Sequence, residues 1–318
     1  MTRFFTIAAL ALVALLATGA SDPHGDAGIQ PELYGAGLFS TGQWDFFMAF
    51  SPDQRRVLFC RANDDFTSYQ IYETRRDDRG RWSAPTMPRF DGGWSNADPH
   101  VTKDGRTVFF ISNRPSPGKA EPESTMDIWY ARLGQDGEWG DAEPTGAPVS
   151  MPGDEWSPST AANGNLYFGA DRPGGLGHND IWMARRVGDH YETPVNLGEA
   201  INTPAGEVEP WIAPDESYLI FSGRGRKDGV GGFDLYLSRR TQGVWGPARL
   251  VGHGVNSPQA DFNQSVSPDG KYLYFSSTRP YVGPQPRRVD SAASDSALIG
   301  IGNGKGDIYR IPVKALGL

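Results

Sequence analysis

Short apolar runs alternate with turn-forming residues along almost the whole chain, and this arrangement returns at regular intervals. Five times, a turn that contains Asp or Asn is followed by a run rich in Leu, Val, Tyr and Phe. The turn residues stand at positions 53, 104, 163, 215 and 269, so successive repeats are 51 to 59 residues apart. A recurring period of this length indicates one supersecondary unit per repeat.

Each repeat predicts four strands. The first alternates and ends at the turn, the second is the apolar run, the third opens with a pair such as Ile-Tyr, and the fourth follows an aromatic residue and a proline. Proline suits an outer edge strand because its missing N–H is not needed there. The last repeat stops soon after its third strand, whereas residues 31–40 resemble the fourth-strand segment 194–202.

We therefore predict an all-β fold: a single closed β-propeller of five four-stranded blades in residues 30–318, with an N-terminal strand completing the last blade. Such closure removes a free sheet edge and locks the ring. A sixth blade stays open as an alternative. The 40 Gly, 25 Pro and 12% aromatic residues agree with many short strands joined by tight turns.

The first twenty residues have the features of a signal peptide, followed by a flexible N-terminus at 21–29. Arg3 supplies the positive start, residues 7–17 are apolar, and small residues precede a cleavage site after Ala20. Cys60 is the single cysteine, so no intrachain disulfide can form. We expect a periplasmic or secreted protein that does not span a membrane.

The net charge of −8 argues against a nucleic-acid partner, which would require a basic face. It is compatible with a cationic partner or a metal ion. We expect a monomer whose partner is an envelope or extracellular protein, or a glycan.

The repeat resembles the TolB-like propeller repeat, which is WD-repeat-like. The resemblance rests on the Ser-Pro-Asp-Gly-Lys turn at 267–271, the aromatic second strand, the Ser-x-Arg-Pro loop at 277–280 and the Asp-Ile-Tyr third strand at 307–309. It covers roughly residues 30 to 315 and implies a propeller. Proteins of this kind include periplasmic interaction modules, domains beside peptidoglycan-binding or peptidase domains, and some glycan lyases.

An arginine follows the second strand of every repeat, and an aspartate opens the third strand of four. We predict that they pair within each blade and tie the intervening loop. The expected pairs are Arg114 with Asp127, Arg172 with Asp180, Arg224 with Asp234, and Arg279 with Asp307. A ring of arginines that binds an anionic ligand is the alternative.

The first strand of each blade is expected to line the central channel. Eight residues before the turns stand Asp45, Asn96, Glu155, Glu207 and Asp261. They predict an acidic mouth at the loop-bearing face, with His100 and Trp211 slightly deeper. This mouth would bind a cation or a cationic ligand; alternatively, each acid bonds loop N–H groups within its own blade. The short hairpins of the turn face offer little freedom to form a pocket.

The leading functional interpretation is a non-enzymatic exported propeller that binds a protein, glycan or small ligand at its loop-bearing face. The alternative is a propeller enzyme, such as a metal-assisted glycan lyase or hydrolase that uses His100 and nearby carboxylates. No cofactor is predicted, although a divalent cation fits the acidic mouth. The insertion at 281–305 belongs to the same rim, either as a lid or as a disordered loop.

Overall fold

The computed structural model describes residues 28–116, 118, 121–284, 286, 288–291 and 300–318. The predicted signal peptide, residues 1–20, and most of the predicted flexible segment 21–29 lie outside the described residues. No helix in the described part of the chain is long and apolar enough to cross a membrane.

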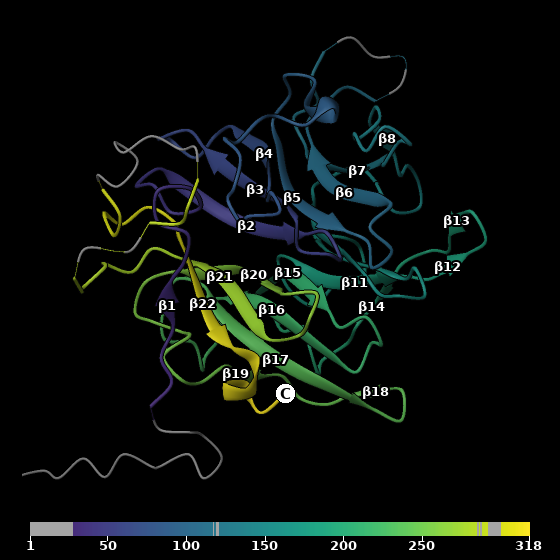
Figure 1. The fold of residues 1–318 in the computed structure, drawn as a ribbon. Helices are drawn as coiled ribbons and strands as arrows, with labels where there is room; N and C mark the ends of the chain where they lie inside the picture. The colour runs from purple at the N-terminus through teal and green to yellow at the C-terminus, as the bar shows by residue number, and fades with distance from the viewer. Residues whose placement is uncertain (1–27, 117, 119–120, 285, 287, 292–299) are drawn as a thin grey trace, which may run out of the picture.

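The five repeats form five small antiparallel sheets around a central channel, which confirms the predicted five-bladed propeller. Figure 1 shows inner strands β2, β5, β15 and β20 near the middle of the molecule and the later strands of each blade further out. Blade 1 contains β2 (Trp44–Phe50), β3 (Arg56–Ala62) and β4 (Tyr69–Arg75), and its fourth strand is reduced to a bridge between Glu73 and Thr86. Blade 2 contains β5 (Asn96–Val101), β6 (Thr107–Ser112), β7 (Asp127–Arg132) and β8 (Glu143–Pro144).

Blades 3 to 5 follow the same order. Blade 3 contains β9 (Glu155–Thr160), β10 (Leu166–Ala170), β11 (Asp180–Ala184) and β14 (Val195–Asn196), with a side hairpin of β12 (Arg186–Val187) and β13 (His190–Tyr191). Blade 4 contains β15 (Gly206–Ile212), β16 (Tyr218–Arg224), β17 (Asp234–Thr241), β18 (Val244–Trp245) and β19 (Arg249–Leu250). Blade 5 contains β20 (Asp261–Val266), β21 (Tyr272–Ser277), β22 (Asp307–Pro312) and β1 (Glu32–Leu33). Short 3-10 helices span Arg89–Asp91 and Val313–Leu316.

The N-terminal strand closes the ring as predicted. β1 pairs antiparallel with β22, with Leu33 opposite Tyr309. The next residue, Tyr34, donates its N–H to the Ile308 carbonyl oxygen at 2.7 Å and packs edge-on against the Tyr274 ring at 5.0 Å between centroids. The last blade is therefore built from both ends of the described chain.

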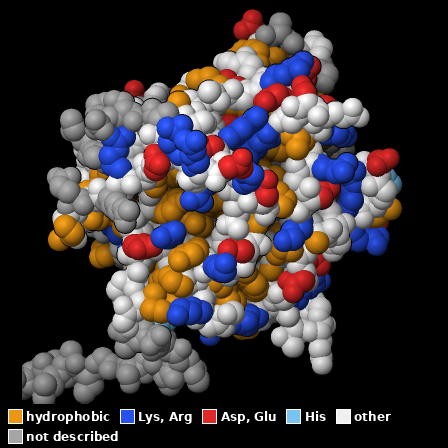
Figure 2. Space-filling model, viewed as in Figure 1, with side chains coloured by type: hydrophobic (Ala, Val, Ile, Leu, Met, Phe, Trp, Pro, Cys, Tyr) orange, Lys and Arg blue, Asp and Glu red, His pale blue; other side chains and the backbone are white. Residues whose placement is uncertain are grey.

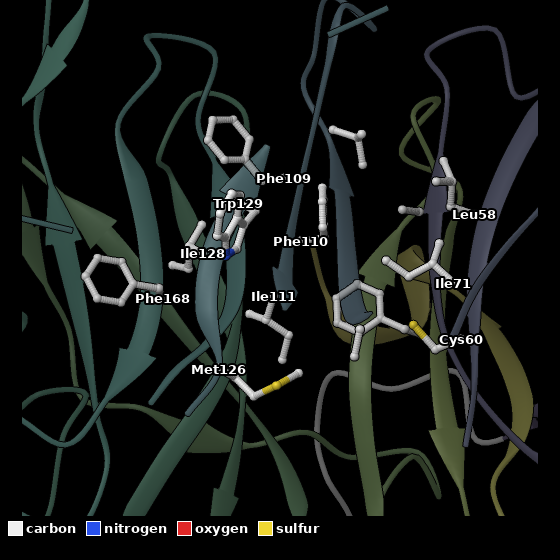
Figure 3. Packing of buried hydrophobic residues seen from close by; sticks show 14 of the residues in the cluster. Leu58, Cys60, Ile71, Phe109, Phe110, Ile111, Met126, Ile128, Trp129 and Phe168 are labelled. Atoms are coloured by element: carbon white, nitrogen blue, oxygen red, sulfur yellow. The ribbon is translucent and has the colours of Figure 1, made fainter. Parts of the chain in front are cut away.

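The core lies between neighbouring blades, where alternating side chains of the second and third strands interdigitate. Figure 3 shows Leu58, Cys60 and Ile71 of blade 1 in the same cluster as Phe110 and Ile128 of blade 2. All five are fully buried. Burial raises the pKa of the Cys60 thiol well above its ordinary value, so this cysteine acts as a small hydrophobic residue. On the face of the molecule shown in Figure 2, Lys and Arg are interspersed with Asp and Glu around a central group of hydrophobic side chains.

Every inner strand carries a one-residue β-bulge at the same place, halfway along the channel. The register shifts by one residue in each pairing of a first strand with its second strand. The bulged residues stand six positions before the turn and have φ values between 48° and 57°: Phe47, Asp98, Ser157, Glu209 and Asn263. Residues other than glycine rarely adopt a positive φ, and a bulge changes the direction of the side chains near it. We call these five residues the mid-channel ring.

Removing residues 1–35, and with them β1, should lower the melting temperature by about 10 °C. The reason is that the β22 edge loses its partner and the Tyr274 ring its cover. The measurement is a thermal melt with light scattering to detect aggregation. Removal of residues 1–27 alone is the control and should melt as the full chain does. Identical melting of the two truncated proteins would contradict the closure by β1.

Candidate functional site

The carboxylates expected at an acidic mouth lie inside their own blades. Asp45, Glu155, Glu207 and Asp261 begin inner strands and are each at most 1% exposed. Each accepts a hydrogen bond from the backbone N–H four residues earlier; the donors are Thr41 (2.7 Å), Met151 (3.2 Å), Thr203 (2.8 Å) and Ser257 (2.6 Å). In blade 2, Asn96 stands in this place and donates to the Asp91 carbonyl oxygen. The structure therefore places the four acids in the arrangement we gave as the alternative, and all five residues are buried away from the mouth.

The repeated arginines bond to these residues instead of to the aspartates of the third strand. Arg172 donates to Glu155 at 2.7 Å and Arg279 to Asp261 at 2.6 Å. Arg114 donates to the Asn96 side chain at 2.8 Å. The physical reason is register, because the start of a first strand lies opposite the end of the second strand that precedes the arginine.

In blade 4 the predicted arginine does not fill this role. Arg226 donates to Glu207 at 2.9 Å, while the Arg224 guanidinium lies over the Phe233 ring at 5.5 Å. The predicted pairs of Arg172 with Asp180, Arg224 with Asp234 and Arg279 with Asp307 are thus not formed in the described structure. Arg114 likewise uses Asn96, and Asp127 opens β7 at a half-buried position.

The aspartates of the third strands hold the loops that precede them. Asp234 accepts hydrogen bonds from the Val230 and Gly231 N–H groups at 2.9 and 3.1 Å, and Asp307 accepts one from Gly302 N–H at 2.7 Å. Asp180 accepts from Leu176 N–H in the same way. Burial raises the pKa of Asp307 to about 7. These residues are loop anchors.

Two carboxylates of the mid-channel ring, Asp98 and Glu209, join neighbouring blades. Asp98 Oδ2 accepts hydrogen bonds from Ser157 N–H at 3.1 Å and Ser157 Oγ at 2.6 Å. Glu209 Oε2 accepts from Asn263 N–H at 2.7 Å and Ser222 Oγ at 2.6 Å. Each carboxylate keeps its other oxygen, Oδ1 or Oε1, without a hydrogen-bond partner among the described residues.

The pKa values of Asp98 and Glu209 are both raised above the ordinary range of a carboxyl group. Burial raises the pKa of Asp98 to about 6, against the opposing effect of the Ser157 hydrogen bonds. Burial, together with the negative charge of Asp98, raises the pKa of Glu209 to about 7. Near neutral pH the pair therefore holds one carboxylate that is mostly ionised and one that still carries a proton for much of the time.

A cavity of about 360 Å³ opens above Glu209 on the loop-bearing face, and aromatic side chains surround it. Its aromatic lining consists of Trp44, Phe46, Phe66, Tyr69, Trp156, Phe233 and Phe262. Phe66 has a φ of 55°, which is costly for a bulky residue, and its ring centroid lies 4.9 Å from that of Trp44. A tight loop in which Asn63 Oδ1 accepts from the Thr67 and Ser68 N–H groups holds it there. We call this space the loop-face cavity.

A second cavity, of about 340 Å³, lies at the other end of the channel, among the turns between first and second strands. We call it the turn-face cavity. His100 and Trp211 line this cavity and not the loop-face cavity. This corrects two expectations, since the turn face does hold a pocket and these two residues belong to it. The reason is position along the strand, because His100 and Trp211 stand four residues before their turns, on the turn side of the bulge.

The described residues contain no group of three or more His, Cys, Asp or Glu side chains arranged to hold a metal ion. The described residues at the mouth therefore offer no set of ligands for the divalent cation that the sequence suggested. The described part of the 281–305 insertion lies beside blade 1, where Trp82 N–H donates to the Asp290 carbonyl oxygen at 2.9 Å. Residues 285, 287 and 292–299 lie outside the described residues, so its role as a lid stays a prediction.

One feature of the sequence indicates the bulges of the mid-channel ring. Proline follows the bulged residue in three blades, at Pro99, Pro158 and Pro210. Proline inside an otherwise regular strand marks a bulge or an edge. It points to Asp98 and Glu209 as channel residues that ordinary strand alternation misplaces.

Replacing Arg172 by Ala should cost about 3 kcal/mol of unfolding free energy, because Glu155 then stays buried without its partner. Adding Glu155→Gln should restore part of the loss by removing that charge. Urea denaturation at pH 8 measures both. Arg185→Ala, which breaks an exposed pair with Glu192, is the control and should leave stability unchanged. Equal stability of the Arg172 and Arg185 variants would contradict the pairing.

Comparisons with known proteins bear on the fold. No family model matches the chain, and no curated protein matches it. Among solved structures, the chain is similar to one of a BT0996 RGII complex, with 10% identity, a TM-score of 0.54, and coverage of 90% of this chain and 92% of the other. It is also similar to one described as "Glycoside hydrolase", with 10% identity, a TM-score of 0.53 and the same coverage. At this identity the likeness establishes a shared propeller fold.

Proposed function

We propose that this protein is a glycoside hydrolase whose substrate binds in the loop-face cavity and whose carboxyl pair is Glu209 and Asp98. The observation that carries the proposal is the pair of inter-blade carboxylates halfway down a channel whose opening is aromatic. Most glycoside hydrolases use two carboxyl groups, one to protonate the leaving oxygen and one as a base or nucleophile.

The surroundings of the two groups suit different roles. Glu209 borders the loop-face cavity and is the group that retains its proton to higher pH, so we assign it the general acid. Its proton passes to the glycosidic oxygen as the bond from that oxygen to the sugar carbon breaks. Asp98, held by Ser157 in the mid-channel ring, is mostly ionised near neutral pH and is assigned the base or nucleophile.

The aromatic opening suits a sugar. The C–H faces of a sugar ring are apolar, and flat aromatic side chains provide matching surface while the rim leaves hydroxyl groups in water. Trp44, Phe66 and Trp156 are partly exposed at this opening, so their rings are available to a ligand. The cavity volume falls within the usual range of small-ligand sites, about 300–1,000 Å³.

The expectation of a non-enzymatic binding protein is corrected here in favour of its alternative, an enzyme that acts on glycans. Solved propellers of the same fold include the one described as a glycoside hydrolase, and the mid-channel carboxylates offer a place for that chemistry. A TolB-like role in binding envelope proteins has no support among the comparisons. The export predicted from residues 1–20 would bring the protein to glycans outside the cytoplasm.

Glu209→Gln and Asp98→Asn should each lower kcat on a cleaved glycan by about 10²–10⁴-fold, since each removes one member of the acid–base pair. The measurement is release of reducing ends from a panel of plant and bacterial polysaccharides and aryl glycosides. Asp269→Asn, in an exposed turn, is the matched control and should retain full activity. Full activity of the Glu209 variant on a substrate that the wild type cleaves would contradict the proposal.

The activity of the wild type should follow a bell-shaped pH profile. It should rise as Asp98 ionises near pH 6 and fall as Glu209 loses its proton near pH 7. The residual activity of Glu209→Gln should lose the alkaline limb, because no proton remains to titrate there. Initial rates between pH 4 and pH 9 test this. An alkaline limb that persists in that variant would assign the acid to another residue.

A further inference from the structure

We propose that the turn-face cavity is a second binding site, separate from the glycan site, for a small uncharged aromatic molecule that carries an acceptor oxygen such as a carbonyl. The proposal concerns binding and does not depend on the function assigned to the loop-face cavity.

The walls of the turn-face cavity suit a flat apolar molecule. All five blades contribute, through Phe50, His100, Thr160, Trp211 and Ser265. The Trp211 ring lies 5.7 Å from the Tyr218 ring between centroids, tilted by 34°, so two aromatic faces form one side. Prolines 52, 99, 214 and 268 add rigid apolar surface. The volume of about 340 Å³ is within the range of about 300–1,000 Å³ usual for small-ligand sites.

Two polar groups in this wall lack a partner among the described residues, the buried Ser265 hydroxyl and one ring nitrogen of the half-buried His100. Ser265 is 5% exposed, and its Oγ has no hydrogen-bond partner among the described residues. His100 Nε2 accepts a hydrogen bond from Thr160 N–H at 2.9 Å, which places the proton of the neutral ring on Nδ1. No described group accepts from that Nδ1–H. A buried hydroxyl without a partner costs free energy. We therefore expect the Ser265 hydroxyl and the His100 Nδ1–H to donate to an acceptor atom on a bound molecule.

The charges around the cavity favour an uncharged occupant. Burial lowers the pKa of His100 to about 4, so the ring is neutral at physiological pH. The charged side chains that line the cavity, Lys103 and Asp269, belong to exposed turns, and Asp269 already accepts from Ser267 Oγ at 2.6 Å. An ion moved into this wall would lose its hydration without a buried partner.

The mid-channel ring separates this site from the glycan site. Phe47 lines the turn-face cavity, whereas Glu209 and Asn263 line the loop-face cavity. A ligand at the turn face therefore need not touch the carboxyl pair. This makes the two sites separable by substitution.

The test uses 4-hydroxyacetophenone as the probe, with 4-ethylphenol and 4-hydroxybenzoate as analogues that lack the carbonyl or add a charge. Calorimetry or ligand-observed NMR on the full chain should show one saturable site that prefers the probe to both analogues. Ser265→Ala should weaken probe binding by about tenfold, because it removes one donor. It should leave 4-ethylphenol binding unchanged. Because Ser265 Oγ has no partner to lose, this variant should fold normally.

Two further variants locate the site. Ser265→Leu should fill the cavity and abolish binding of the probe, while Glu209→Gln should bind it as the wild type does. The proposal is overturned if the probe does not saturate, if it binds no better than its analogues, or if Ser265→Leu still binds it. Loss of binding in Glu209→Gln alone would place the probe in the loop-face cavity, which also overturns it. None of these results depends on whether the chain cleaves a glycan.

Discussion

The bond between a buried acid and the loop that precedes it determines how each inner strand begins. In blades 1, 3, 4 and 5 a carboxylate with at most 1% exposure accepts hydrogen bonds from the N–H of a residue four positions earlier and from an arginine at or just beyond the end of the second strand. Burying an ionised carboxylate costs free energy unless the group is paired and hydrogen-bonded. One side chain thus ties together the incoming loop, the first strand and the end of the second. These bonds fix the position of the channel rim, which carries the aromatic side chains of the loop-face cavity.

Below this rim, the bulges divide the channel into two compartments of different chemistry. Above the mid-channel ring, Glu209 faces a space bordered by seven aromatic side chains. Below it, His100 and Ser265 face a space bordered by aromatic and proline side chains. The ring itself is held by bonds between blades, such as Asp98 with Ser157 and Glu209 with Asn263. The same residues that hold neighbouring blades together are therefore those available for chemistry.

This dual use explains why the two carboxylates differ from the many other acids of the chain. The turn aspartates, such as Asp269, are exposed, and hydrogen bonds from Ser267 and Lys271 hold their pKa low. The rim acids are buried but engaged with loops and arginines. Asp98 is buried and Glu209 half-buried, both without an arginine partner among the described residues, and each bonds to a neighbouring blade. Burial also raises the pKa of Asp307 and Glu155, so it is the position between blades in the channel, and not the pKa alone, that sets Asp98 and Glu209 apart.

The sequence by itself determined the repeat, and with it the number of blades, the order of strands and the closure by an N-terminal strand. The turn chemistry and apolar runs that encode these features are local, so they can be read along the chain. Only the tertiary structure decided which side chains bond to each other. Arg172 is eight residues from Asp180 and seventeen from Glu155, yet strand register places it at Glu155. His100 and Trp211 were assigned to the wrong end of the channel, although each stands only four residues before its turn. The acids at the strand starts were assigned to the channel because strand alternation assumes a strict period of two. One bulge per strand breaks that period, so Trp156 lines the loop-face cavity and its neighbour Glu155 does not.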